Sequence, residues 1–300
     1  MLQEINASSS FKMSPIIAGT MKWGIWGARF STQQYVSMIE SCLENNVTTF
    51  DHADIYGHYT VEEEFGKALL MDASLRKKMQ LITKCGIKMI SANRPVHTIK
   101  SYDTGKQHII NSVENSLKNF NTDYIDMLLI HRPDPLINAI QIAEVFNLLK
   151  QQGKVLHFGV SNFNPSQAEM INSYFPLTAN QVEISILQLD AFTDGTLDHC
   201  QTKNIVPMAW APLGGGNIFS SEEERSKRII AVANLLAEKY NALPEQILLA
   251  WLLQHPAKIK PVLGTAKQQR IKPAIEAIKI NLLREEWFAL WRASTGKEVD

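Results

Sequence analysis

Eight short apolar runs, separated by segments of helical period, constrain the fold of this chain more than any other feature of its sequence. Most of the runs are nearly continuous in apolar residues, which is typical of parallel strands whose two faces are both covered. Alternation of such strands with helices predicts a parallel sheet enclosed by helices. The runs are residues 15–20, 48–53, 79–85, 125–131, 157–162, 179–185, 206–212 and 260–265.

The segments between the runs are polar on one face and apolar on the other, as surface helices are. Their ends carry the usual signals, because Pro165 is placed to open one helix and Gly153 to end another. Eight strand–helix units suit a closed (β/α)8 TIM barrel better than an open doubly wound sheet. The dinucleotide fingerprint GxGxxG is also absent from the sequence. The clearest helical segments are residues 31–46, 105–120, 138–153 and 165–175.

No linker or low-complexity segment divides the chain, so we interpret residues 1–300 as a single barrel domain. Two segments, residues 86–105 and 213–228, are longer than a barrel connection needs. Each follows a predicted strand and therefore belongs to the C-terminal face, where barrel enzymes keep their active sites. We predict extra loops at that face.

Thirty basic and thirty acidic side chains leave the chain without net charge, which argues against binding to nucleic acid or to an anionic membrane surface. The cysteines, Cys42, Cys85 and Cys200, are too few and too far apart for a disulfide framework and indicate a reducing compartment. Residues 1–15 lack the apolar segment of a signal peptide, and the longest apolar runs are too short to span a bilayer. We therefore expect a cytoplasmic protein.

Residues 50–59, FDHADIYGHY, contain two aspartates, two histidines and two tyrosines. The cluster suggests a metal site, but side chains alternate along a strand, so His52 and Asp54 point away from the side of Asp51. A site that used all of these groups would need both faces of the strand. We expect no metal, and a metal-dependent barrel hydrolase using His52, Asp54 and His58 is kept as an alternative.

Three neighbouring predicted strands end in polar side chains of the types that carbonyl reduction requires. Reduction leaves negative charge on the carbonyl oxygen, which must be protonated or stabilised. A tyrosine is able to donate the proton if an adjacent ammonium lowers its pKa. A buried ammonium needs a carboxylate partner, and a histidine is able to orient the carbonyl. The candidate catalytic residues are Asp51, Tyr56, Lys84 and His131.

The same motifs resemble those of the aldo-keto reductase superfamily, and most closely a bacterial branch defined mainly by sequence. FDHADIYG resembles the family pattern FDTAxxYG, which assigns the carboxylate to Asp51 and the proton-donating tyrosine to Tyr56. The motifs ITKCG and IHRPD supply Lys84 and His131. The resemblance covers nearly the whole chain and implies NADPH-dependent reduction of an aldehyde or ketone, with a small-molecule carbonyl compound as substrate.

The resemblance further implies that NADP(H) binds in an extended form. Residues expected beside the nicotinamide are Gly19, Thr20, Met21, Ser161, Asn162, Gln181 and the stacking residue Trp210. Backbone amides expected at the pyrophosphate lie between Leu213 and Gly216, including Gly214. Residues expected around the 2′-phosphate are Gly264, Thr265, Lys267 and Arg270. On physical grounds, too, a cation pair with a hydroxyl at a helix N-terminus suits a dianionic phosphate.

The chain departs from the family pattern in four places. His52 replaces a small residue after the aspartate, Trp210 replaces the usual tyrosine, and Ala274 stands where an asparagine often contacts adenine. The fourth departure is the length of residues 86–105, which form part of the pocket rim.

Other residues near the motifs have a structural interpretation. We expect Glu62 to stabilise the fold and Cys85 to point away from Lys84 into an apolar environment. Trp23 and Trp26 are placed either to line the pocket or to pack in the core. For the chain as a whole, the alternative to an enzyme is an NADPH-binding module that senses redox state with little turnover.

Overall fold

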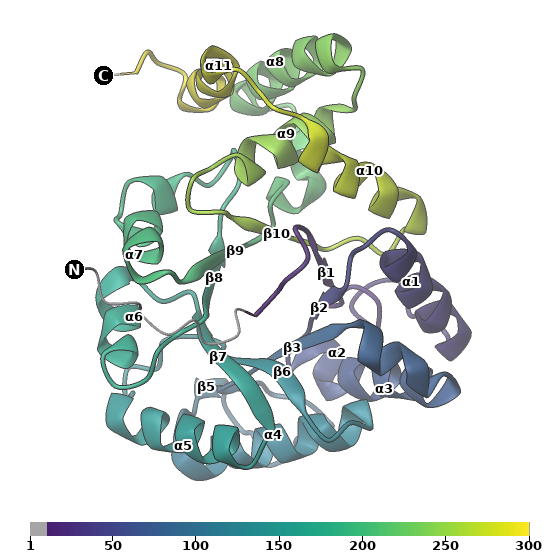
Figure 1. Ribbon diagram of the computed structural model, residues 1–300, viewed down its shortest axis with the longest axis vertical. Helices are drawn as coiled ribbons and strands as arrows, with labels where there is room; N and C mark the ends of the chain where they lie inside the picture. The colour runs from purple at the N-terminus through teal and green to yellow at the C-terminus, as the bar shows by residue number, and fades with distance from the viewer. Residues whose placement is uncertain (1–10, 300) are drawn as a thin grey trace, which may run out of the picture.

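The computed structural model describes residues 11–299, and in it eight parallel strands close into a barrel (Figure 1). The ring order is β1-β10-β9-β8-β7-β6-β3-β2. Seven of the predicted apolar runs contain one of these strands and the eighth, residues 157–162, overlaps β7, so the predicted (β/α)8 barrel is confirmed. The strands are β1 (Ile17–Gly19), β2 (Thr49–Asp51), β3 (Gln80–Cys85), β6 (Ile125–Ile130), β7 (Val155–Ser161), β8 (Ala179–Glu183), β9 (Val206–Trp210) and β10 (Lys260–Leu263).

Helices surround the strands, and their ends follow local sequence signals (Figure 1). Ser31 and Gln34 form a capping box at the start of α1, and Asn164 caps α6, whose first residue is Pro165. Gly153 follows α5 with φ of 69°, as a helix stop requires. The surrounding helices are α1 (Thr32–Glu44), α3 (Val61–Met71), α4 (Lys106–Phe120), α5 (Ala139–Gln151), α6 (Pro165–Asn172), α7 (Thr196–Lys203), α9 (Pro244–Leu253) and α10 (Ile271–Glu276).

Two further helices, α8 (Glu224–Tyr240) and α11 (Arg284–Thr295), lie side by side outside the ring at the top of Figure 1. Trp287 of α11 stacks on Trp251 of α9 with ring centroids 4.7 Å apart and planes 14° apart. Each indole N–H donates to the other residue's carbonyl oxygen, at 3.1 and 3.0 Å. Helix α8 begins at Glu224, so the prediction of a loop over residues 213–228 is wrong for the last of these residues.

The remaining elements are short. The segment after β3 contains the antiparallel hairpin β4–β5 and belongs to the predicted extra loop. None of the helices in residues 11–299 is long and apolar enough to cross a membrane. The short elements are β4 (Ile87–Lys88), β5 (Ser101–Tyr102), α2 (Tyr56–Tyr59), η1 (Ala73–Lys78), η2 (Asp190–Phe192), η3 (Gly214–Phe219), η4 (Gln268–Arg270) and η5 (Ala277–Lys279).

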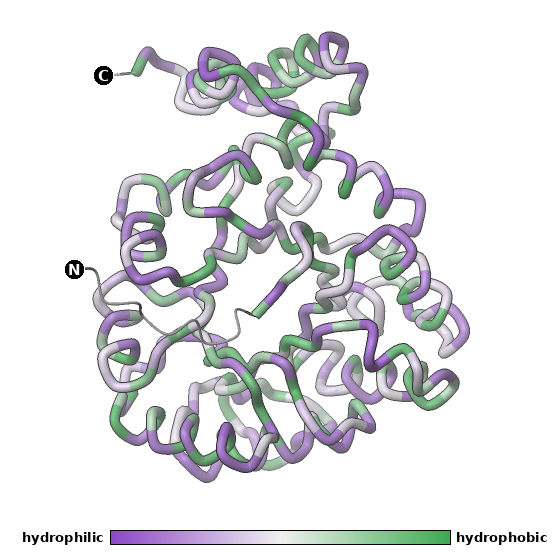
Figure 2. The backbone as a smooth tube through the Cα atoms, in the orientation of Figure 1, coloured by the Kyte–Doolittle hydropathy of each residue, from purple (hydrophilic) through white to green (hydrophobic). Residues whose placement is uncertain are grey.

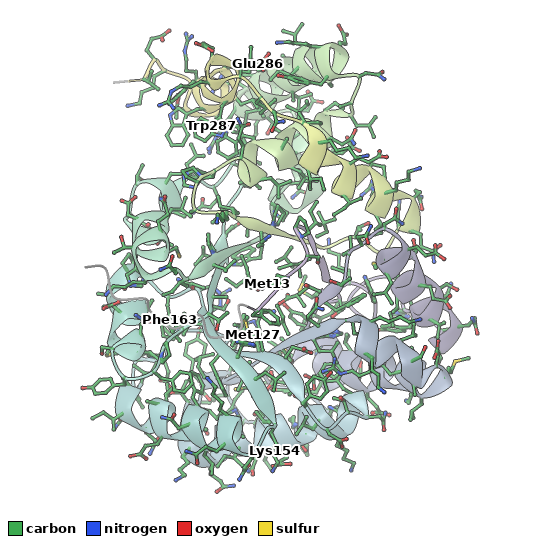
Figure 3. The ribbon with its side chains drawn as sticks, viewed as in Figure 1. Met13, Met127, Lys154, Phe163, Glu286 and Trp287 are labelled. Carbon is green, nitrogen blue, oxygen red and sulfur yellow. The ribbon has the colours of Figure 1, made fainter. Side chains whose placement is uncertain are left out.

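Apolar side chains fill both the barrel and the layer beneath the helices. Inside the barrel Ile17, Ile82 and Met127 are fully buried, and Met13 packs against this cluster (Figure 3). Along the helices that surround the strands hydrophobic and hydrophilic residues alternate (Figure 2), so one face of each of these helices packs on the sheet. The packed interior leaves the C-terminal ends of the strands to carry the polar groups.

Candidate active site

Lys84, in β3, has no exposed surface and lies at the centre of a polar cluster. Its Nζ lies 2.7 and 2.8 Å from the two carboxylate oxygens of Asp51 and 2.7 Å from the carbonyl oxygen of His52. The phenol oxygen of Tyr56 is 3.2 Å away. Burial lowers the pKa of Lys84, but attraction to Asp51 and Tyr56 outweighs burial and leaves that pKa above its ordinary value. Lys84 is therefore a buried, paired cation.

Tyr56 is half-buried at the start of α2, in the segment after β2, with its phenol beside this cation. Burial raises the pKa of Tyr56, Lys84 opposes the rise and Asp51 adds to it. The expectation that Lys84 lowers this pKa is correct for its own contribution and wrong for the net direction. The Tyr56 phenol is consequently protonated near neutral pH.

His131 follows β6 and faces Tyr56, with ring centroids 6.2 Å apart. Burial lowers the pKa of the His131 imidazole well below its ordinary value, and Lys84 and Arg132 lower it further. The ring is therefore neutral and carries one N–H donor. Its Nδ1 has no hydrogen-bond partner within residues 11–299.

The turn after Tyr56 is left-handed over three consecutive residues. Gly57, His58 and Tyr59 have φ of 59°, 58° and 71°. A Cβ at Gly57 would lie 2.8 Å from a methyl group of Val61, so any other residue there would force Val61 to shift in addition to adopting the left-handed conformation. Backbone strain of this kind is found at functional sites.

The two tryptophans after β1 have different environments. Trp23 is fully buried and packs against Phe65, Tyr35 and other aromatic rings, which is the core role. Trp26 is half-buried, with its ring 6.2 Å from that of Tyr56, so it borders the polar cluster.

Residues suggested as metal ligands lie in three separate environments. The His52 ring is fully buried against Phe65 and Phe120, Asp54 faces a different cavity, and His58 is exposed. In the part of the chain that the structure describes, no group of three or more His, Cys, Asp or Glu residues is placed to hold a metal ion. The hydrolase alternative therefore has no support from the geometry.

The residues expected at the nicotinamide form a connected set. Asn162 Nδ2 donates to Ser161 Oγ at 2.8 Å, and Trp210 Nε1 donates to Asn162 Oδ1 at 2.9 Å. Gln181 is linked to the same set, because its carbonyl oxygen accepts from Ser161 Oγ at 3.0 Å. Asn162 holds a left-handed conformation with φ of 62°. β7, β8 and β9 thus bring together four of the seven expected residues.

The other three expected residues follow one another at the end of β1. Gly19 and Thr20 are buried, whereas Met21 is 38% exposed. Thr20 Oγ1 lies 3.0 Å from the carbonyl oxygen of Asp51. Only Met21 of the three presents a side chain at the surface, and the assignment of all three to the cofactor stays a prediction.

The two segments expected at the phosphates are open. Gly214 and Gly216 have φ of 57° and 90°, and their amides donate to Ala211 and Leu213 at 2.8 and 2.9 Å. After β10, Gly264, Lys267 and Arg270 are exposed, and the Lys267 amide donates to Thr265 Oγ1 at 3.1 Å. Within residues 11–299, neither Lys267 nor Arg270 has an ion-pair partner. Ala274, the departure from the family pattern, is buried and packs against Ile16 and Leu263.

The Aldo/keto reductase family model matches residues 15–294. The chain belongs to the aldo/keto reductase family. It is 44% identical to the uncharacterized oxidoreductase YcsN of Bacillus subtilis strain 168, over 99% of this chain and 100% of that protein. It is 40% identical to a 6-dehydroglucose reductase of Agrobacterium fabrum, over 99% and 100% of the two chains. A crystal structure of an aldo-keto reductase from Klebsiella pneumoniae in complex with NADPH has 25% identity and a TM-score of 0.76, covering 93% of this chain and 90% of that one.

This aldo/keto reductase is therefore an oxidoreductase, and the sequence resemblance is confirmed. Sequence reasoning missed Arg132, which directly follows His131 and is half-buried. Arg132 lowers the pKa of both His131 and Tyr56, so its guanidinium lies within electrostatic reach of both. It has no ion-pair partner in the described part of the chain. Its position next to His131 was the available signal.

A separate cavity of about 130 Å³ lies on the other side of β3 from Lys84. Glu62, in α3, accepts hydrogen bonds from Thr83 at 2.6 Å and from Ser116 at 2.8 Å. These contacts tie α3 to β3 and α4, which agrees with the structural role expected for Glu62. The cavity is lined by Asp54, Tyr59, Glu62, Ile87, Arg94, His97, His108, Asn111, Ser112, Asn115 and Asn119.

Proposed function

We propose that this aldo/keto reductase reduces an aldehyde or ketone to an alcohol with NADPH, and that Tyr56 is the general acid. The contact between Tyr56 and the buried Lys84 ammonium, at 3.2 Å, carries the proposal. A protonated phenol is able to give its proton to the carbonyl oxygen as negative charge develops there. The adjacent cation then stabilises the phenolate that is left behind.

The other residues support this proton transfer. Asp51 keeps Lys84 charged despite its burial, because two carboxylate contacts compensate for lost hydration. Neutral His131 offers its one N–H to the carbonyl oxygen and so orients it opposite Tyr56. In the direction of alcohol oxidation the phenolate acts as the base.

The residues fit NADP(H), which supplies the hydride when bound. Ser161, Asn162 and Trp210 would hold the nicotinamide end, and the glycine-rich turn after β9 leaves room for a pyrophosphate. Lys267 and Arg270, which lack ion-pair partners in the described residues, would pair with a 2′-phosphate. The Klebsiella pneumoniae relative in complex with NADPH supports this assignment.

The relatives narrow the first substrates to test. Because the Agrobacterium fabrum relative is named a 6-dehydroglucose reductase, we include a hexose carrying an aldehyde at its sixth carbon. The aromatic ring of Trp26 and the guanidinium of Arg132, which has no ion-pair partner in residues 11–299, border the cluster and suit a sugar, through stacking and hydrogen bonding.

The test is NADPH consumption, followed by absorbance, with 4-nitrobenzaldehyde and with the hexose aldehyde. We expect aldehyde-dependent consumption, and a loss on the order of a hundredfold or more in Tyr56→Phe with NADPH binding retained. Wild-type turnover in Tyr56→Phe would refute the assigned acid. NADPH that stays bound through gel filtration, without consumption on any aldehyde, would favour the redox-sensing module instead.

A further inference from the structure

A hydrogen-bond chain joins the buried ring of His52 to the backbone beside Lys84. His52 Nδ1 lies 2.9 Å from Thr20 Oγ1, and Thr20 Oγ1 lies 3.0 Å from the carbonyl oxygen of Asp51. The backbone supports this arrangement, because Gly19 pairs with Asp51 in the parallel register of β1 and β2. Thr20 and His52 therefore face each other one residue beyond the last paired position.

These hydrogen bonds determine which nitrogen of the His52 ring carries the proton. The Thr20 hydroxyl has one hydrogen, and when it donates to the Asp51 carbonyl it accepts from His52 Nδ1. Nδ1 then carries the proton, and Nε2, which has no partner within the described residues, keeps only a lone pair. Burial holds the pKa of His52 well below its ordinary value, and Lys84 lowers it further, so the ring stays neutral.

The same residue contributes a direct contact to the polar cluster. Lys84 Nζ donates to the carbonyl oxygen of His52 at 2.7 Å, as short as its contact with Asp51 Oδ1. An ammonium has three donors, and the pair of carboxylate contacts with Asp51 does not use all of them. The orientation of the peptide groups around His52 therefore determines where Lys84 lies relative to the phenol of Tyr56.

We propose that His52 is a positioning residue: through Thr20 its ring fixes the end of β2, so that the Asp51 carboxylate and the His52 carbonyl together hold Lys84 against Tyr56. The inference rests on the proposed function, in which Lys84 assists proton transfer by Tyr56. It gives a role to the residue that replaces the small residue of the family pattern.

A purely structural role makes a different prediction. The His52 ring packs edge-on against Phe65 and Phe120, at centroid distances of 4.5 and 4.9 Å. Leucine suits such an apolar site and removes the unpaired Nε2, so His52→Leu should keep or raise the thermal midpoint. A residue that only packs is then replaceable without functional loss.

The experiment compares His52→Leu with the conservative variant His52→Asn, whose amide N–H is placed near the position of Nδ1. Thr20→Val and Thr20→Ser form a second pair that removes or keeps the hydroxyl. For each variant we measure kcat, the KM for NADPH, and the pH titration of Tyr56 in protein labelled with carbon-13 tyrosine. The Tyr56 signal is identified by its absence in Tyr56→Phe.

We expect His52→Leu to lose on the order of tenfold in kcat. Thr20→Val should lose at least as much, but Thr20 is also expected beside the nicotinamide, so for the Thr20 pair the Tyr56 titration without cofactor is the deciding measurement. The Tyr56 pKa should rise in both variants, because Lys84 lowers this pKa more than Arg132 does, and Arg132 stays in place. The KM for NADPH should change less than about twofold in His52→Leu, since the His52 side chain packs against Phe65 and Phe120 and not at the expected cofactor site. His52→Asn and Thr20→Ser should recover most of the kcat and the Tyr56 titration.

Unchanged kcat and an unchanged Tyr56 titration in both His52→Leu and Thr20→Val would overturn the inference. So would a loss in His52→Leu accompanied by no change in the Tyr56 titration. Because the titration needs no substrate, it separates the two proposals. Suppose that the wild-type protein shows no turnover but that the Tyr56 titration differs between wild type and His52→Leu. That result would refute the proposed function and support the positioning role.

Discussion

Gln181 Nε2 donates a 2.8 Å hydrogen bond to Asp51 Oδ1, the same oxygen that accepts the 2.7 Å hydrogen bond from Lys84. The bond crosses the barrel, since β8 and β2 lie on opposite sides of the closed sheet. A residue expected at the nicotinamide is therefore also a partner of the buried carboxylate. If Gln181 contacts the nicotinamide as proposed, its amide links cofactor binding to the position of Lys84.

Gln181→Leu should consequently affect two measurements together. The substitution keeps the side-chain size but removes a donor to Asp51, so we expect kcat to fall on the order of tenfold and NADPH affinity to weaken. Cofactor affinity is followed by fluorescence titration and kcat by NADPH consumption. If affinity alone changed, the bond to Asp51 would have no part in turnover.

Removal of Lys84 should destabilise the fold. Lys84→Met leaves the Asp51 carboxylate buried without its cation, which costs about 3–5 kcal/mol of unfolding free energy. The double variant Lys84→Met with Asp51→Leu should recover part of this loss, because no unpaired charge remains. Urea unfolding measures both values.

A matched control is Lys67→Met, which breaks an exposed 2.7 Å pair with Glu63. There we expect a change of less than about 0.5 kcal/mol, because exposed ion pairs contribute little. Equal losses of unfolding free energy in Lys67→Met and Lys84→Met would show that burial of the pair between Lys84 and Asp51 does not determine the cost of removing its cation.

Lys267→Ala and Arg270→Ala should each weaken NADPH binding about tenfold and leave NADH binding unchanged, because NADH lacks the 2′-phosphate. Lys272→Ala is the control, since Lys272 is also an exposed cation of the same region. The measurement is the dissociation constant of NADPH and of NADH for each variant. A similar loss for NADH would place these cations at another part of the cofactor.

The buried histidines should make the fold less stable in acid. The pKa of His52 in the folded chain lies well below its ordinary value of 6.5. Below about pH 6.5 the unfolded chain therefore binds a proton that the folded chain does not, and stability falls by up to about 1.4 kcal/mol per pH unit.

His52→Leu removes this contribution, so its unfolding free energy relative to wild type should increase as the pH falls. Urea unfolding at about pH 7.5 and about pH 5.5 measures the difference. A difference between the two proteins that is independent of pH would show that the His52 pKa is the same in the folded and the unfolded chain, and would contradict this prediction.

The eight strands could be predicted because each is a short, nearly continuous apolar run, and the polar residues that interrupt those runs at one end identify the site. Asp51, Lys84 and His131 are conspicuous for that reason. The hydrogen-bond partners of the site residues were harder to predict from the sequence. The contact between Thr20 and His52 depends on the register of β1 against β2, and the contact between Gln181 and Asp51 depends on closure of the barrel.

Two other features could not be predicted from local patterns. The pKa of Tyr56 depends on whether burial or Lys84 has the larger effect, and burial is known only once the chain is folded. The helices α8 and α11 are not required by a barrel, so the alternation of strands and helices gives no reason to expect them outside the ring. The packing of α11 on α9 through Trp287 and Trp251 is a contact between distant segments.

The stacked indoles of Trp251 and Trp287 make α11 visible to spectroscopy. At 4.7 Å and 14° their electronic transitions couple, so the pair should give a strong near-ultraviolet circular dichroism signal and quenched fluorescence. Detachment of α11 from α9 would separate these two rings and weaken both signals at once, leaving the stack of Trp287 on Trp291 within α11. The near-ultraviolet circular dichroism and fluorescence of this tryptophan pair therefore report whether α11 is packed on α9.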